Sequence, residues 1–379
     1  MITLDHIRPY HDSEVNQALL DYMEHPMIMA MLQFTFPQKS MEEIVTIVKS
    51  CRSIRDFQTK IIYNSVRMVL DKSSEGLTTS GFEKLQTDES YLFISNHRDI
   101  ILDTSLLNVA LYDHNLVMTA SAIGDNLVKK PFLMALSKLN RSFLIMRNLP
   151  PREMLGTSKL VSEYIQKLLL KENRSVWIAQ REGRTKDGND KTQQGVLKML
   201  ALANDETEQM DYFKKLKIVP VSISYEFDPT DVLKMPELMA KHHDIEYVKS
   251  SNEDFNSILK GATGKKKRIH VSAGKVISNE LDIIKNSGEQ ANGQLQMLAE
   301  LLDKAIHKNY KLWPSNYLAY DMLHNTQAFK KKYTIKEKRQ FERRIKRRVE
   351  ANNKVALHNF LKMYATPVTN CLNYDEEQI

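Results

Sequence analysis

Cysteine is scarce in this chain of 379 residues, which holds only Cys51 and Cys371, far apart in the sequence. Two isolated cysteines supply no disulfide framework, and they lack the close spacing of a cysteine-based metal site. The sequence therefore predicts a protein of a reducing compartment, and we expect the cytoplasm.

Long apolar runs are also absent. No stretch reaches the ~18 apolar residues that indicate a membrane-spanning helix. The best candidate, residues 27–36, is short and contains Gln33 and Thr35. The first residues, Met1 to His6, show neither the basic nor the apolar region of a signal peptide. We therefore expect any work at a membrane to be done from its surface.

Positive charge is concentrated in one segment. Residues 328–348 hold eleven Lys/Arg against two Glu, a local charge of +9, whereas the whole chain carries +7. The other residues therefore sum to −2, which argues against a nucleic-acid-binding surface.

The basic segment, residues 328–350, is typical of an amphipathic helix. Phe341, Ile345 and Val349 lie four apart and form a narrow apolar stripe between basic faces. Such a helix binds an anionic bilayer with ~1 kcal/mol per cation near the surface. The alternative is a solvated helix whose stripe packs on the rest of the protein. We expect the segment to contact an anionic membrane surface, on the inner face of the cell membrane.

The composition, 42% hydrophobic and 27% charged, is that of a folded protein. Residues 1–75 are predicted to form a helical subdomain. Within it, Ser40 and Glu43 form a capping-box pattern, which predicts a helix that begins there and ends at about residue 54. The Met-rich stretch 27–32 fits a packed core better than an acyl groove. Residues 76–280 predict an α/β domain, and residues 281–379 a helical region that includes the basic helix.

Short apolar runs alternate with helical patterns in the middle region, which predicts a mixed, mainly parallel sheet flanked by helices. The predicted strands are residues 76–81, 91–94, 116–120, 142–146, 175–179, 217–224 and 268–273. The main predicted helices between them are residues 100–111, 131–139, 151–170 and 192–203. A short basic run at 264–268 is expected to be a solvated turn.

Polar residues follow three of these strands. His97, Arg147 and the cluster at 181–184 each come directly after a strand. Because ligands bind at the carboxyl ends of strands in parallel sheets, one rim of the sheet is expected to hold the site. His97 and Asp103 lie where a strand turns into a helix, which suits a histidine base with a carboxylate behind it.

At this point the chain resembles the glycerolipid acyltransferase family, which includes glycerol-3-phosphate and 1-acyl-glycerol-3-phosphate acyltransferases. That family has four ordered sequence blocks, and all four can be placed within residues 76–280. They are Ser95-Asn96-His97-Arg98 with Asp103, Phe143-Leu144-Ile145-Met146-Arg147, Glu182-Gly183-Arg184, and residues 218–226 from Ile218 to Glu226.

The resemblance implies an enzyme that moves an acyl group from coenzyme A or acyl carrier protein to a phosphate-bearing glycerol acceptor. It assigns His97 as the base and Asp103 as its orienting partner, with Arg147, Glu182, Gly183 and Arg184 at the acceptor. No metal or organic prosthetic group is implied.

Three positions depart from the family pattern. His97 and Asp103 are separated by five residues instead of four, so either Asp103, after a bulged turn, or Asp99 orients the histidine. The third block has its arginine one place early, which leaves Arg184 or Lys186 as the phosphate contact. The second block has Asn140-Arg141 where a glycine is usual.

Two alternatives stand beside this reading. One is an acyltransferase for an acceptor without phosphate, such as an aminolipid. The other is a non-catalytic lipid-binding protein that uses the basic helix. His97-Arg98-Asp99 also matches the start of a kinase catalytic loop, but Thr104 replaces the required asparagine and no glycine-rich phosphate loop precedes it.

Overall fold

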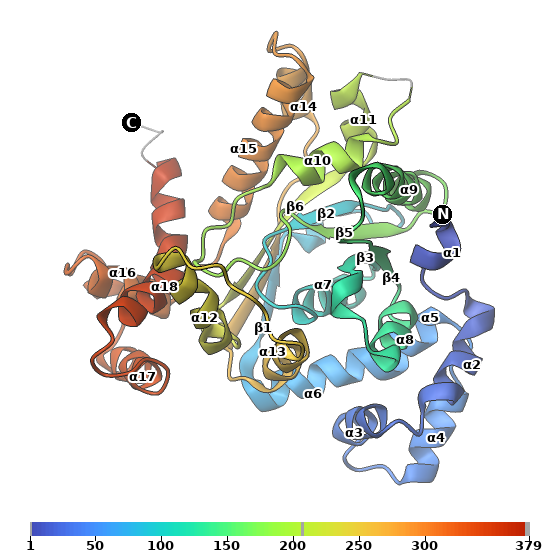
Figure 1. The fold of residues 1–379 in the computed structure, drawn as a ribbon, viewed down its shortest axis with the longest axis horizontal. Helices are drawn as coiled ribbons and strands as arrows, with labels where there is room; N and C mark the ends of the chain where they lie inside the picture. The colour runs from blue at the N-terminus through green and yellow to red at the C-terminus, as the bar shows by residue number, and fades with distance from the viewer. Residues whose placement is uncertain (1, 206–207, 376–379) are drawn as a thin grey trace.

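The computed structural model describes residues 2–205 and 208–375, and within them the chain forms one seven-stranded sheet with helices around it (Figure 1). Residues 376–379, the end of the predicted C-terminal helical region, lie outside the described residues. The strands are β1 (Ser74–Ser80), β2 (Leu92–Ser95), β3 (Thr119–Gly124), β4 (Ser142–Ile145), β5 (Ser175–Ala179), β6 (Ile218–Tyr225) and β7 (Lys267–Ala273).

Helices precede, connect and follow the strands. The first group is α1 (Leu4–Ile7), α2 (Asp12–Tyr22), α3 (Pro26–Thr35), α4 (Met41–Lys49), α5 (Ile54–Phe57) and α6 (Tyr63–Ser73), with a π-helical turn at Gln58–Ile62. Between strands lie α7 (Leu102–Asp113), α8 (Pro131–Leu139), α9 (Pro151–Leu170), α10 (Gln194–Ala201), α11 (Gln209–Lys215), α12 (Asp231–His242) and α13 (Glu253–Thr263). The last group is α14 (Asn279–Lys285), α15 (Ala291–Asn309), α16 (Pro314–Leu323), α17 (Ile335–Lys346) and α18 (Lys354–Asp375).

The sheet has the order β1-β7-β6-β2-β5-β3-β4. The five strands from β6 to β4 are mutually parallel, β7 is antiparallel to β6, and β1 is parallel to β7. The predicted mixed, mainly parallel α/β fold is therefore confirmed. Because the five strands point the same way, their carboxyl ends meet at one edge of the sheet.

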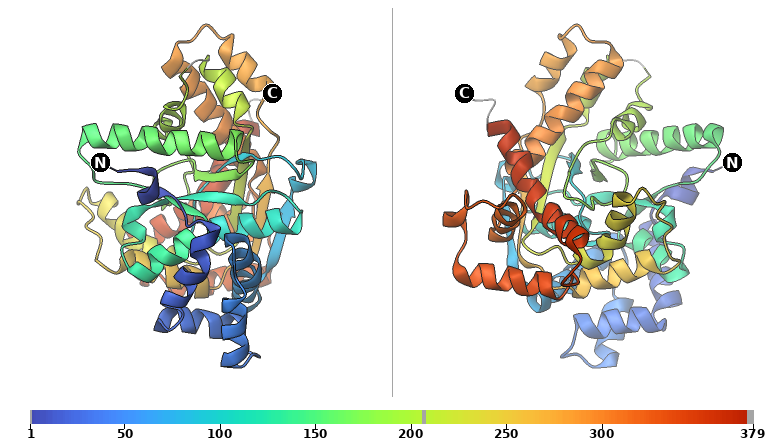
Figure 2. Two further views of the ribbon diagram at one scale, coloured as in Figure 1. Left: turned by 90° about the vertical axis from the view of Figure 1, so that its right-hand side faces the viewer. Right: turned by 60° about the vertical axis from the view of Figure 1, so that its left-hand side comes forward.

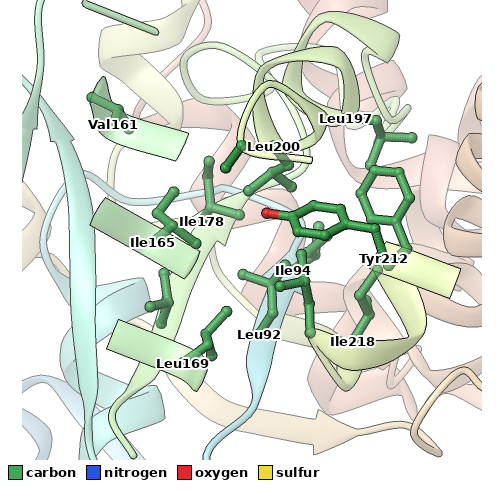
Figure 3. Packing of buried hydrophobic residues seen from close by; sticks show 14 of the residues in the cluster. Leu92, Ile94, Val161, Ile165, Leu169, Ile178, Leu197, Leu200, Tyr212 and Ile218 are labelled. Atoms are coloured by element: carbon green, nitrogen blue, oxygen red, sulfur yellow. The ribbon is translucent and has the colours of Figure 1, made fainter. Parts of the chain in front are cut away.

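Both faces of the sheet are buried, which explains why its central strands are apolar without alternation. Leu92 and Ile94 of β2 pack in one cluster with residues of α9 such as Ile165 (Figure 3). Phe93, between them, packs in a second cluster with α6 and α7. Successive strand residues point to opposite faces, so a short apolar strand contributes to both layers.

The N-terminal and C-terminal helices lie in well separated parts of the molecule (Figures 1 and 2). In the first group, Ile28 and Leu32 of α3 are buried in a separate cluster with α2, α4 and α8. The cavity there has about 10 Å³, room for about one water molecule. Ile28 and Leu32 of the Met-rich stretch are thus core, as predicted, whereas Met27 and Met31 are half-buried at the edge of the cluster.

The predicted apolar stripe of the basic segment is not available to a membrane. Phe341, Ile345 and Val349 are 1%, 9% and 8% exposed and pack with α16 and α18. The helix is also shorter than predicted, because α17 begins at Ile335, directly after Thr334, whose side chain accepts from the Glu337 N–H as a cap. Packing of the stripe on the protein, the alternative stated above, is what the structure shows.

Several predicted boundaries are wrong by a few residues. The helix after the Ser40 capping box ends at Lys49, because Ser53 caps a new helix, α5. Strand β3 begins at Thr119 and runs to Gly124. The basic run before β7 is not fully solvated, since Lys266 is 0% exposed and donates to Ser73 Oγ at 2.7 Å. None of the helices in the described part of the chain has the length and hydropathy of a bilayer-crossing segment.

Two glycine substitutions give opposite stability predictions. At Gly81, φ is +84° and an added Cβ would lie 1.9 Å from the Ala273 carbonyl oxygen, so Gly81→Ala combines a left-handed backbone with a clash at the end of β7. We expect it to lower the free energy of unfolding by at least about 2 kcal/mol. Gly156 lies inside α9 with open space around it, so Gly156→Ala should raise the same quantity by about 0.5–1 kcal/mol.

Urea denaturation of both variants measures this contrast. A Gly81→Ala protein as stable as the parent would contradict the close approach of β1 and β7 at this point.

Candidate active site

His97 follows β2 at the carboxyl edge of the sheet, and its ring reaches a carboxylate on the next helix. His97 Nδ1 lies 2.9 Å from Asp103 Oδ2, and Asp103 is 0% exposed in the first turn of α7. The histidine is 9% exposed. The sequence pattern predicted this strand, turn and helix, and the structure places the two predicted residues in direct contact.

Hydrogen bonds to Asp103 determine which ring nitrogen of His97 carries the proton. Asp103 Oδ2 accepts from the backbone N–H groups of Arg98 and Asp99, at 2.6 and 3.0 Å. Asp103 Oδ1 accepts from the Tyr225 hydroxyl at 2.8 Å. A carboxylate surrounded by donors accepts from His97 Nδ1–H as well, which leaves a lone pair on Nε2. Nε2 is the atom that can take a proton from a bound hydroxyl.

The extra residue between His97 and Asp103 is absorbed in a turn. Helix α7 begins at Leu102, and Asp99 Oδ1 accepts from the N–H groups of Ile101 and Leu102 at 3.1 and 2.9 Å. Asp99 therefore holds the turn before the helix and does not contact the histidine ring. Burial raises the pKa of the Asp99 carboxyl, and the charge of Asp103 adds to this effect. Of the two carboxylates left open by the sequence, Asp103 is the partner of His97.

Tyr225 is a site residue that the sequence reasoning missed. It ends β6, is 4% exposed, and its hydroxyl reaches Asp103 across the sheet edge. Burial, followed by the charge of Asp103, raises its pKa well above the usual value, so it remains a donor to the carboxylate. The signal was its place in the fourth block, directly after the predicted strand at residues 217–224.

Two further residues fix the strand end that carries His97. The side-chain amide of Asn96 donates to the Ile223 carbonyl at 3.0 Å and accepts from the Ile223 N–H at 2.8 Å, which ties the turn to β6. The Trp177 ring on β5 meets the His97 ring edge-on, with centroids 5.5 Å apart. Trp177 Nε1 donates to Ser95 Oγ at 2.9 Å. The imidazole is therefore held by a buried ring and a buried carboxylate.

Arg147 and Glu182 come together at the same edge, after β4 and β5. Arg147 Nη1 donates to Glu182 Oε1 at 2.8 Å, with side-chain exposures of 29% and 69%. The Arg147 backbone N–H donates to Asp125 Oδ1 at 3.1 Å, which anchors the segment after β4. The pair is accessible, so an anionic ligand can compete with Glu182 for the guanidinium.

Arg184 and Lys186 differ in what they bind. Arg184 is 8% exposed and donates only to the hydroxyls of Thr230 and Ser257, at 3.4 and 3.3 Å. Lys186 Nζ instead forms an ion pair with Glu237 Oε2 at 2.5 Å. No carboxylate of the described residues pairs with Arg184, so of these two cations it is the one whose charge is not neutralised by an ion pair.

The loop that carries Arg184 is attached to the His97 turn. The Thr185 N–H donates to the His97 carbonyl oxygen at 3.0 Å. Gly183 has φ +69° and open space where a side chain would stand, so ligand atoms can approach its backbone. The side-chain amide of Gln180, 0% exposed at the end of β5, makes no hydrogen bond within residues 2–205 and 208–375. The first and third blocks thus share one rim.

A buried charged network supports the turn from the other side. Arg98 forms an ion pair with Asp190, and Lys234 Nζ donates to the Arg98 carbonyl oxygen at 3.0 Å while it pairs with Asp228. Burial alone would lower the pKa of Arg98, but the surrounding acidic groups, Asp190 first and then Tyr310 and Asp228, together outweigh it and the pKa is raised. Spacing in the sequence did not reveal these pairs. In the described part of the chain, no group of three or more His, Cys, Asp or Glu side chains is arranged to hold a metal ion.

Comparison with known proteins gives a family match for the middle of the chain. Residues 76–224 match the family model named Acyltransferase. The chain has no significant match among curated protein sequences. Among solved structures it is similar to the 1-acyl-sn-glycerophosphate (LPA) acyltransferase PlsC from Thermotoga maritima. The identity is 13% and the TM-score 0.37, over 77% of this chain and 91% of that one.

The matched residues run from β1 through most of β6 and include His97, Asp103, Arg147 and Arg184. The family resemblance indicated by the four sequence blocks is confirmed over this range. Residues 76–224 therefore form an acyltransferase domain, and the protein is an acyltransferase.

Proposed function

We propose that this enzyme transfers a fatty acyl group from a thioester to a hydroxyl of glycerol 3-phosphate or 1-acyl-glycerol 3-phosphate. The donor is acyl-CoA or acyl carrier protein, and the product enters phospholipid synthesis. The observation that carries the proposal is the pairing of His97 Nδ1 with the buried Asp103, which leaves Nε2 as a base at the carboxyl edge of the sheet.

The proposed reaction is a direct transfer. His97 Nε2 takes the proton of the acceptor hydroxyl as its oxygen attacks the thioester carbonyl carbon. The new C–O bond gives a tetrahedral intermediate, which collapses as the C–S bond breaks. The imidazolium then returns the proton to the departing thiolate. Asp103 stabilises the imidazolium between the two proton transfers, and no serine or cysteine nucleophile is needed.

The acceptor phosphate is proposed to bind between two guanidinium groups. Arg184 has a buried charge without a carboxylate partner, and Arg147 has an exchangeable one in Glu182. A guanidinium fork matches phosphate oxygens, and such charge-assisted bonds are stronger than neutral ones. Gly183 allows the acceptor to approach the backbone closely. Glu182 would accept a hydrogen bond from an acceptor hydroxyl once Arg147 binds the phosphate. No metal or prosthetic group takes part.

We also propose that the enzyme works at the inner face of the cell membrane through the basic segment. Of its eleven cations, nine are exposed: Lys330, Lys331, Lys332, Lys336, Lys338, Arg339, Arg343, Lys346 and Arg347. Arg344 and Arg348 are instead bound to Asp231, at 2.7 and 2.8 Å. With the apolar stripe buried, adsorption would be electrostatic and would not require insertion.

Thiol release from acyl-CoA, with each acceptor offered separately, tests the mechanism. We expect turnover with one acceptor, a loss of at least ~10²-fold in His97→Ala, and a comparable loss in Asp103→Asn. Tyr225→Phe removes one of four donors to Asp103 and should reduce kcat about tenfold. Undiminished turnover in His97→Ala would exclude this mechanism. Acyl carrier protein as donor and an aminolipid acceptor are tested in the same assay, and exclusive use of the aminolipid would favour the phosphate-free alternative.

The phosphate site is tested by substitutions within one loop. Arg184→Gln should raise KM for the phosphate-bearing acceptor at least about tenfold, because a charge-assisted hydrogen bond is lost. Lys186→Gln, two residues away, should change KM little, since Lys186 is bound to Glu237. Steady-state kinetics with a monoacylglycerol acceptor, which has no phosphate, provides the reference. An equal KM increase for both acceptors would contradict a phosphate role for Arg184.

Membrane adsorption is tested by charge reversal. Changing Lys330, Lys331 and Lys332 to Glu should abolish co-sedimentation with phosphatidylglycerol vesicles at ~0.1 M salt, because each cation contributes ~1 kcal/mol. The matched control reverses three exposed lysines elsewhere, Lys84, Lys171 and Lys198, with the same change in net charge. Equal loss of binding in both triple variants would show that total charge, and not the basic segment, governs adsorption.

A further inference from the structure

A polar cavity lies at the edge of the sheet opposite to the edge that carries His97. It has a volume of about 250 Å³. We call it the amino-edge cavity, and its polar lining includes Arg55, Gln58, Asn115, Arg141, Asn173 and Arg174. A single water needs about 10–15 Å³ of such space, so the cavity admits a polyatomic ion with part of its hydration shell.

The topology separates this cavity from the active site. Arg141 and Arg174 immediately precede β4 and β5, whereas His97 follows β2, which is parallel to β5 and paired with it. A strand of five residues such as β5 spans about 16 Å. A ligand in the amino-edge cavity would therefore not occupy the acceptor site.

Three guanidinium groups share the cavity without a carboxylate partner among the described residues. Arg141 makes no side-chain hydrogen bond there, although its Nε is buried. Arg174 has one long contact, 3.5 Å from Nη1 to the Met118 carbonyl oxygen. Arg55 is exposed at the rim. Buried polar groups are nearly always hydrogen-bonded, so an unbonded guanidinium nitrogen requires an explanation.

Carboxylates in the region are engaged elsewhere. Asp12 and Glu172 both act electrostatically on Arg141, but Asp12 Oδ1 accepts from the Ile54 N–H at 2.9 Å, and Glu172 pairs with Lys167 at 2.9 Å. Burial, and then the charge of Arg174, lower the pKa of Arg141 to about 10. Arg174 also has a lowered pKa, through burial and the charge of Arg55. The three cations thus repel one another in an incompletely solvated space.

The backbone at Arg141 is a second departure from the ordinary pattern. Helices α7, α8 and α9 each lead into a strand through a left-handed residue, namely Asn115 at φ +56°, Arg141 at +59° and Asn173 at +44°. Glycine and asparagine are the usual residues in this position after a helix. The left-handed conformation is energetically unfavourable for an arginine. The guanidinium of Arg141 does not offset this cost, because it forms no hydrogen bond with the carbonyl groups at the end of the helix.

Helix ends offset only part of the positive charge. The C-termini of α7, α8 and α9 each carry about −0.5 of an elementary charge, whereas the three arginines carry +3. Asp12 adds a charge of −1, and the charge of Glu172 is offset by Lys167, so the lining keeps a small positive excess. An anionic ligand would neutralise it and supply acceptors for the unbonded guanidinium nitrogens.

We propose that the amino-edge cavity is a second, non-catalytic binding site for a phosphate group, held by Arg141 and Arg174 with Arg55 at the rim. The phosphate belongs either to a soluble phosphate compound or to a phosphomonoester lipid headgroup, because both present the same oxygens to guanidinium groups. The site does not depend on the acyl transfer proposed above.

Titration calorimetry with inorganic pyrophosphate, and separately with monomeric dihexanoyl phosphatidic acid, tests the proposal. The reference is the full chain with Arg147→Gln and Arg184→Gln, so that phosphate binding at the active site does not contribute. Adding Arg141→Gly should raise Kd at least tenfold, whereas Arg152→Gln, on the exposed start of α9, is the matched charge control and should leave Kd unchanged. Binding of pyrophosphate indicates a soluble ligand, and binding of the lipid alone indicates a headgroup.

Thermal unfolding distinguishes a binding role from a structural one. Glycine suits φ +59°, and Arg141→Gly removes an unpaired charge, so the Tm without ligand should rise. Pyrophosphate or the lipid should raise the Tm of the reference and not that of Arg141→Gly. The proposal is overturned if neither probe binds, if Arg141→Gly binds as tightly as the reference, or if Arg141→Gly unfolds at a lower Tm.

Discussion

The carboxylate of Asp103 is the point on which the candidate active site depends. It is fully buried, and it accepts from two backbone N–H groups, a tyrosine hydroxyl and His97. Taking a carboxylate out of water is unfavourable unless such donors replace the water. The donors come from β6, the turn after β2 and the histidine itself, so the charge is stable only when the sheet edge is assembled. The orientation of His97 by the buried Asp103 therefore depends on the assembly of this edge of the sheet.

The parallel sheet divides polar function between its two edges. At the carboxyl edge, loops after β2, β4 and β5 bring His97, Arg147 and Arg184 onto one rim. At the amino edge, the turns that enter β4 and β5 bring Arg141 and Arg174 to a cavity that Arg55 of α5 also lines. Both arrangements depend on strand direction, because the loops that precede parallel strands lie at one edge of the sheet and the loops that follow them lie at the opposite edge. The two edges are separated by the length of one strand, and both belong to the same sheet.

Charged residues in this protein cannot be assigned to solvent or to a site from their density in the sequence. In the basic segment, Arg344 is buried against Asp231 and Tyr364, while most of its neighbours are exposed. In the basic run before β7, Lys266 is buried and bonded to Ser73. Arg184 and Lys186 have similar chemistry and lie two residues apart, yet only Lys186 has a carboxylate partner. The distinction arises from the side chains that face them, because Lys186 meets Glu237 of α12 whereas Arg184 meets the hydroxyls of Thr230 and Ser257.

The sequence by itself determined the strands, the mainly parallel sheet, the order of the four blocks and the rim that holds His97. Apolar runs and local caps carry this information, because burial on two faces and helix termini depend on neighbouring residues. Only the tertiary structure decided that Asp103 and not Asp99 orients the histidine, that Tyr225 completes the site, and that the Phe341 stripe is core. Tyr225 and Asp103 are 122 residues apart. Contacts of that kind depend on how strands and helices assemble, which local spacing does not encode.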